Sequence, residues 1–215
     1  MIMNTFLHNF GISMVELNDQ LPGHQNGENT YQPGIGPYGE DQIVDLVMDK
    51  LLQSGGINES FIIRPSAAQK KELGLSEYKG LTGRSATPDL VLGNKLIEFK
   101  IARPLRDNGQ LEDTWFKKVF DPHPTSYSTF IDVEKLTRFG DKYDYNEKFE
   151  KWIVVIGFER HQEDVYQLDK LFPGLFTFIS ENIVGRTVKD QISMSFRLSD
   201  RHPFHQVVKL FSYRF

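Results

Sequence analysis

The sequence predicts an α/β domain in which helices flank a mixed central β-sheet. Two segments, 95–101 and 192–198, alternate apolar and polar residues with the period of a strand. Two others, 38–53 and 129–139, repeat apolar residues with the period of a helix. Segment 152–158 is apolar on both faces, as is typical of a strand buried between layers. The order of these segments suggests a two-layer or three-layer α/β domain.

Composition narrows the class of protein. The chain has 215 residues, of which 39% are hydrophobic, so it can bury the core of one ordinary domain. It has no cysteine, which excludes a disulfide scaffold and a thiolate metal site. No apolar run reaches the roughly 18 residues of a membrane-spanning helix, and residues 1–16 lack the Lys and Arg of a signal peptide. We therefore expect a soluble, cytoplasmic protein with no membrane partner.

Loop-forming residues dominate after the N-terminus, since residues 18–39 are rich in Gly, Pro, Asn and Gln. We therefore expect residues 1–37 to be an N-terminal arm or irregular lead-in. Residues 38–215 then form a single domain with a C-terminal β extension, in which 207–215 pairs with the alternating segment before it.

The elements of the domain follow in order. A helix at 38–53 is followed by a strand at 61–65 and a short helix or loop at 66–80. A β-hairpin is expected at 87–101, because the two strands are joined by the tight-turn pair Gly93-Asn94. A long polar stretch then leads to the second helix, at 129–139, and to the buried strand.

The hairpin places three charged side chains together. Glu98 and Lys100 are two residues apart, so they leave the same face of the returning strand. The turn sets Asp89 roughly opposite Glu98, while Ile97 and Phe99 pack on the other face. Two carboxylates on a rigid hairpin are oxygen ligands suited to Mg²⁺. A lysine beside them can position a water or stabilise charge on a phosphate.

This pattern resembles the signature of a known family. Pro88-Asp89, followed after eight residues by Glu98-Phe99-Lys100, is similar to the motif of the PD-(D/E)XK nuclease superfamily. The resemblance covers about residues 38–158 and implies a restriction-endonuclease-like core with the order α-β-β-β-α-β. It also implies that Asp89 and Glu98 bind Mg²⁺, for which Mn²⁺ substitutes, and that Lys100 is catalytic.

Family members often carry a further acidic residue on the first helix, and Glu40 fits that role. It precedes Ile43, Val44 and Val47 by three, four and seven residues, so it shares their core-facing stripe. The resemblance therefore adds Glu40 to the expected catalytic residues.

The resemblance implies a Mg²⁺-dependent DNA endonuclease, of the type II restriction kind. Cutting both strands usually calls for two active sites, so we expect a homodimer on double-stranded DNA. Several alternatives stay open: a non-specific repair or defence nuclease, an exonuclease, or a silent member of the fold that binds nucleic acid or a protein. The sequence discloses neither a recognition site nor a choice between DNA and RNA. A plain Glu98–Lys100 ion pair on an exposed hairpin is the competing account.

Basic side chains around the motif are candidates for phosphate contacts. Segment 102–128 mixes four of them with aromatic residues, which suits phosphate binding but also suits a surface loop with a buried Trp115. Family members often place a basic residue on the second helix, which makes Lys135 a candidate. The full candidate set is Arg84, Arg103, Arg106, Lys117, Lys118 and Lys135.

Charge and histidine patterns at the C-terminus are less specific. From Arg186 onward the chain carries six basic and two acidic side chains, whereas residues 1–63 carry one basic and eight acidic ones. Phosphate binding needs a local positive surface, so the acidic total does not exclude nucleic acid. His202 and His205 have the spacing of a metal pair, but without acidic companions nearby in the sequence they favour a surface loop.

Overall fold

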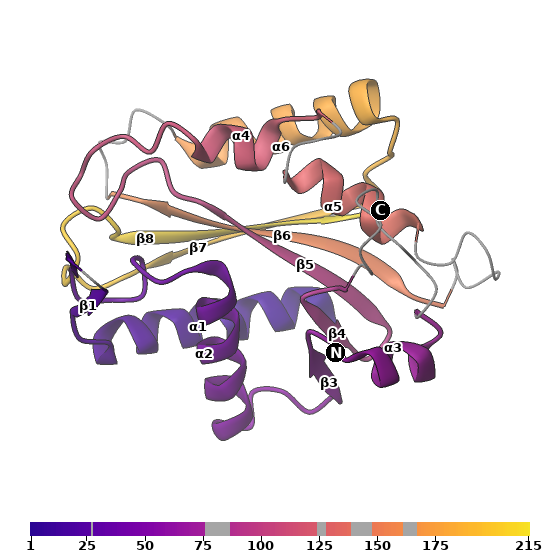
Figure 1. Ribbon diagram of the computed structural model, residues 1–215, viewed down its shortest axis with the longest axis horizontal. Coiled ribbons are helices and arrows are strands. Elements are labelled where there is room, and N and C mark those ends of the chain that lie inside the picture. The colour runs from indigo at the N-terminus through magenta and orange to yellow at the C-terminus, as the bar shows by residue number, and fades with distance from the viewer. Residues whose placement is uncertain (27, 76–86, 124–127, 139–147, 161–166) are drawn as a thin grey trace.

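The computed structural model describes residues 1–26, 28–75, 87–123, 128–138, 148–160 and 167–215 (Figure 1). The helices are α1 (Met3–Gln20), α2 (Glu40–Gln53), α3 (Ala67–Leu73), α4 (Trp115–Phe120), α5 (Thr129–Arg138) and α6 (Leu168–Ile179), which continues into the π-helical turn η2 (Ser180–Val184). The strands are β1 (His24–Asn26), β2 (Asn29–Tyr31), β3 (Phe61–Ile63), β4 (Leu90–Leu92), β5 (Lys95–Ala102), β6 (Glu150–Glu159), β7 (Asp190–Arg197) and β8 (Val207–Arg214).

Six strands form one mixed sheet in the order β3-β4-β5-β6-β8-β7. Strands β5 and β6 run parallel, and the other neighbours in this sheet run antiparallel. The predicted α/β class with a mixed, helix-flanked sheet is confirmed. The expected order α-β-β-β-α-β occurs as α2, β3, β4, β5, α5 and β6, with α3 and α4 inserted.

Helices cover both faces of the sheet, which makes three layers (Figure 1). Helices α1 and α2 lie on one face, where Ile97 and Phe99 of β5 point into their core. Helices α4, α5 and α6 lie on the other face, where Leu96 and Ala102 join a second core. The predicted alternation of β5 is therefore confirmed, and Glu98 and Lys100 share the face that α4 and α5 cover.

The N-terminal segment is not the irregular lead-in that the sequence suggested. Met3–Gln20 is a helix of 18 residues that packs into the core. The ring of Phe10 stacks on Phe99 at 5.4 Å between centroids. Gly11 lets the helix approach β7 closely, because a Cβ there would collide with the Phe196 ring. Residues 1–20 therefore belong to the domain, and irregular chain is confined to the stretch around β1 and β2.

The C-terminal strands pair as predicted, with Asp190 opposite Arg214 and Arg197 opposite Val207. They do more than extend the domain, because β8 also pairs with β6 and so lies inside the sheet. Helices α4 and α6 were not expected. Among the described residues, no helix is both long and apolar enough to cross a membrane.

Candidate functional site

The hairpin of β4 and β5 has the register that the sequence predicted. Leu90 pairs with Ile97, so Asp89, one residue before β4, lies opposite Glu98. The backbone N–H of Phe99 donates to Oδ2 of Asp89 at 2.8 Å. This bond holds the Asp89 carboxylate against β5, next to the side chain of Glu98.

The segment that carries Asp89 is held from three sides. The backbone N–H of Arg64 donates to the Asp89 carbonyl at 2.9 Å. Nζ of Lys70, on α3, donates to the Thr87 hydroxyl at 3.0 Å, and Nζ of Lys135, on α5, donates to the Thr87 carbonyl at 3.2 Å. Contacts from separate elements therefore fix the chain directly before the candidate metal ligand.

Arg64 has an unusual backbone, with φ at 42°, which a non-glycine residue adopts only when its surroundings hold it there. Its guanidinium pairs with Asp41 and Asp45 of α2. Arg64 therefore connects the helix that carries Glu40 to the chain that carries Asp89.

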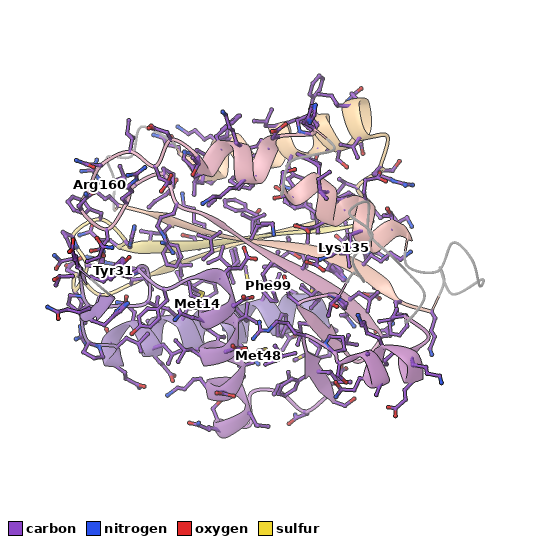
Figure 2. All side chains as sticks on the ribbon, viewed as in Figure 1. Met14, Tyr31, Met48, Phe99, Lys135 and Arg160 are labelled. Atoms are coloured by element: carbon purple, nitrogen blue, oxygen red, sulfur yellow. The ribbon has the colours of Figure 1, made fainter. Side chains whose placement is uncertain are left out.

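Two lysines lie among the carboxylates, on the α5 side of the sheet. Nζ of Lys135 is 2.5 Å from Oε1 of Glu98 and 3.6 Å from Oδ1 of Asp132. Nζ of Lys100 is 2.9 Å from Oδ2 of Asp132 and 3.6 Å from Oε1 of Glu40. Figure 2 shows Lys135 beneath α5, whereas Phe99, Met14 and Met48 lie on the face that α1 and α2 cover. We call Glu40, Asp89, Glu98, Lys100, Asp132 and Lys135 the site cluster.

Burial shifts the acid–base properties of the site cluster. It raises the pKa of the Glu40 carboxyl to about 7, and it raises the pKa of Asp89 as well. The pKa of Glu98, which is 1% exposed, is raised well above its usual range by burial and by the charge of Asp89. Burial alone would lower the pKa of Lys100 and of Lys135, but their carboxylate neighbours outweigh it and raise both. Both ammonium groups therefore stay charged at neutral pH.

The charge balance of the site cluster fits a divalent cation. Its four carboxylates face two ammonium groups, so two negative charges are in excess when every group is ionised. Among the described residues, no group of three or more His, Asp or Glu side chains has the geometry to hold a metal ion. Mg²⁺ keeps most of its waters and needs only one or two carboxylates, so a pair such as Asp89 and Glu98 would be a sufficient set of ligands.

A cavity of about 330 Å³ opens beside the site cluster, between α2, β5 and α4. Glu40 and Lys100 line it together with Arg103, Trp115 and Lys118. Trp115 is buried and Lys118 is exposed at the rim. Two of the six substrate-binding candidates thus lie at the same cavity as the site cluster.

Arg103 presents its guanidinium to this cavity, which Glu112 also lines. Its guanidinium donates to the Tyr38 carbonyl at 2.7 Å and lies 5.7 Å from the centre of the Phe158 ring. Its Nε finds no hydrogen-bond partner in the described part of the chain, and burial lowers the pKa of Arg103 to about 10. A half-buried guanidinium whose Nε is a spare donor is suited to an anionic ligand.

The remaining substrate-binding candidates are placed differently. Lys135 belongs to the site cluster itself. Arg106 is exposed and pairs with Glu112 at 3.3 Å, and Lys117 is exposed on α4 away from the cavity lining. Arg84 lies outside the described residues.

Sequence reasoning missed Asp132. It lies on α5 three residues before Lys135, and its two oxygens contact Lys100 and Lys135. The available signal was the spacing from Lys135, because side chains three residues apart lie on the same side of a helix. The partner Lys100 is distant in the sequence, so the pairing itself had no local trace.

The expectation of a surface loop at His202 and His205 is wrong, because both side chains are fully buried. Nε2 of His202 lies 2.6 Å from Oδ1 of Asp107, the acidic companion that the local sequence lacks. Nδ1 of His202 accepts the backbone N–H of His205 at 3.0 Å, and Nε2 of His205 lies 3.1 Å from the Leu105 carbonyl. These histidines therefore join the 105–107 loop to the β7–β8 connection, which is a structural role.

No protein-family model, curated protein or solved structure matches this chain. Its resemblance to PD-(D/E)XK nucleases therefore rests on its own residues and on the geometry described above.

Proposed function

We propose that the protein is a Mg²⁺-dependent nuclease with a restriction-endonuclease-like core, and that it hydrolyses phosphodiester bonds in double-stranded DNA. The observation that carries the proposal is the convergence of Asp89, Glu98 and Lys100 at one end of a rigid hairpin. The element order from α2 to β6 supports it, as does Glu40, which reaches Lys100 from the first turn of α2.

The proposal gives each residue a role. Asp89 and Glu98 hold Mg²⁺, which when bound polarises the scissile phosphate and activates water. Lys100 acts as a charged donor that orients the attacking water or the phosphate, because Asp132 and Glu40 keep its Nζ protonated. Arg103 and Lys118 contact neighbouring phosphates at the cavity beside it.

The type II restriction activity and the homodimer belong to the same proposal. One site cluster per chain can serve one strand, and cleavage of both strands at one position calls for a second copy related by a two-fold axis.

One observation favours a second candidate, a nucleic-acid-binding protein of this fold that does not cut. The ammonium of Lys135 lies 2.5 Å from Oε1 of Glu98, so it already neutralises one of the two metal ligands. For cleavage, Mg²⁺ has to compete with that ion pair.

Digestion of a defined genome, followed by sequencing of the ends, tests the proposal. Discrete ends that appear with Mg²⁺ and not with a chelator support a restriction-type endonuclease. Ragged ends indicate a nuclease with little sequence preference. Absence of cutting by a folded, DNA-binding protein favours the second candidate.

A further inference from the structure

A second cavity, of about 610 Å³, lies at the end of the sheet where β6 begins and β8 ends. Thr137, near the C-terminal end of α5, forms part of its wall. The other walls come from the start of β6, the end of β8, and the segment between η2 and β7. No residue of this cavity belongs to the site cluster.

The cavity lining is strongly cationic. Lys151, Arg186, Lys189 and Arg214 all line it, and among the described lining residues Glu150 is the one acidic side chain. Three of these cations, Arg186, Lys189 and Arg214, are among the six basic residues from Arg186 onward. None of the three belongs to the site cluster or lines the cavity beside it.

The cations differ in how far they are neutralised. Arg186 pairs with Glu134 of α5 at 2.9 Å. Arg214 lies over the Trp152 ring, and its Nε is buried without a hydrogen-bond partner in the described ranges, since Asp190 is 3.9 Å away. Lys189 is exposed. An orphaned buried donor beside further positive charge is a place where an anion gains hydrogen bonds and neutralises charge.

The cavity lies close to the site cluster. Lys151 pairs with Leu96 of β5 in register, and Glu98 lies two residues further along the same strand, on the same face. The two positions are thus about 7 Å apart along the strands and about 5 Å across them. Successive phosphates of one nucleic-acid strand follow at about 3.4 Å of helix axis. Because the backbone also winds around that axis, neighbouring phosphates are farther apart than this rise, and a phosphate close to the one cut at Glu98 can reach the level of this cavity.

We propose that this cavity binds a backbone phosphate of the nucleic-acid substrate, outside the position that is cut. The inference rests on the proposed function and adds to it a second anchoring point, on the far side of α5 from Arg103 and Lys118. Arg186 joins the cavity wall to Glu134 of α5. Helix α5 also carries Asp132 and Lys135 of the site cluster, so a strand bound in the cavity is held in a fixed position relative to that cluster.

The test compares two double variants, each of which removes two positive charges. Lys189→Gln with Arg214→Gln changes the cavity, and Lys170→Gln with Arg197→Gln is the control, since both control residues are exposed outside it. Binding of a short fluorescent DNA duplex is measured against salt concentration, with Ca²⁺ in place of Mg²⁺. We expect the cavity variant to bind about tenfold more weakly and to lose about one unit of the log–log salt slope, because the one phosphate contact that it removes contributes about 0.9. The control keeps the slope of the unaltered protein.

Equal slopes for the cavity and control variants, with normal binding by the unaltered protein, overturn this inference and leave the proposed function intact. Absence of salt-dependent binding by the unaltered protein overturns the proposed function itself. Inorganic phosphate, added at constant ionic strength, distinguishes the source of the anion. If it raises the melting temperature of the unaltered protein but not of the cavity variant, while the DNA slopes stay equal, the cavity is a free-phosphate site and the backbone assignment is wrong.

Discussion

Two ionic clusters in this protein, each with a buried strand glutamate, are built from similar parts. The site cluster has Glu98 on a central strand, Lys100 beside it, and Glu40 in the first turn of α2. The second cluster, at the other end of the sheet, has Glu159 on β6, Lys209 on β8, and Asp169 in the first turn of α6. We call these last three residues the Glu159 cluster.

The two clusters differ in how their charges are satisfied. Oε1 of Glu159 accepts the Leu168 backbone N–H at 2.5 Å, and Oε2 lies 2.5 Å from Nζ of Lys209, which also contacts Asp169 at 2.6 Å. The N-terminus of α6 thus supplies the hydrogen bond that satisfies the second carboxylate oxygen of Glu159. The site cluster has the same ratio, with four carboxylates for two lysines, but Glu40, Glu98 and Asp132 are largely shielded from water, whereas Asp169 is exposed. A buried ion pair is therefore no sign of a site by itself, whereas an excess of charge that is shielded from water beside a cavity favours one.

The largest expected difference between the two clusters comes from substituting the lysine of each. Lys100→Met should lower the single-turnover cleavage rate by about a hundredfold or more, or about 3 kcal/mol, because a positioned catalytic group is lost. Lys209→Met should leave that rate within about threefold and should lower the free energy of unfolding by about 1–3 kcal/mol, because Glu159 keeps a buried charge without its cation. Rapid-quench cleavage and urea unfolding measure the two effects. A Lys100→Met enzyme that cuts as fast as the unaltered protein would remove Lys100 from the mechanism.

A smaller effect is expected from Asp132→Asn. The amide still accepts a hydrogen bond, but it no longer holds Lys100 and Lys135 by charge, so the cleavage rate should fall about tenfold while DNA binding is retained. Asp169→Asn is the control and should leave the rate unchanged. The same loss in both variants would mean that Asp132 acts only on stability.

The smallest expected effect is the change with pH in the free energy of unfolding of the metal-free protein. The pKa of Glu40 is raised from 4.5 to about 7, so its contribution to stability is complete below the ordinary pKa and is lost as the pH rises through 7. Hydrogen bonding to Lys209 lowers the pKa of Asp169, so Asp169 stabilises the fold above its ordinary pKa and loses this effect in acid. At about pH 8, Glu40→Gln should raise the free energy of unfolding, and Asp169→Asn should lower it by less than about 1 kcal/mol. Urea unfolding with a chelator present checks both signs, and a destabilised Glu40→Gln variant contradicts the account.

Local patterns in the sequence predicted the centre of the fold well. The period-2 alternation of β5 and the stripe of α2 each depend on residues a few positions apart, so both could be recognised without a structure. The tight turn between β4 and β5 likewise set Asp89 opposite Glu98.

The parts that sequence reasoning missed depend on tertiary packing. Helix α1 buries Gly11 and Asn18 along with its apolar residues and has no side-chain cap, so its ends carry no clear signal. Helix α6 contains Pro173 inside its span, which locally favours a break, but burial of Phe172 and Phe176 against the sheet outweighs the missing hydrogen bond. Asp132 and Lys135 reach their partners only when α5 packs on β5.

Plasmid cleavage by a second matched pair, Glu98→Gln and Glu159→Gln, tests the central claim most directly. Each variant replaces one buried strand glutamate by its amide, and each is assayed with Mg²⁺, with Ca²⁺ and with a chelator. We expect the unaltered protein and Glu159→Gln to cut supercoiled plasmid with Mg²⁺ only, because Ca²⁺ is larger and organises the attacking water poorly. Glu98→Gln should stay folded, bind the plasmid and leave it intact. Cutting by Glu98→Gln at the rate of the unaltered protein, or no cutting by a folded unaltered protein with Mg²⁺, would contradict the assignment of the site cluster as a metal-dependent nuclease site.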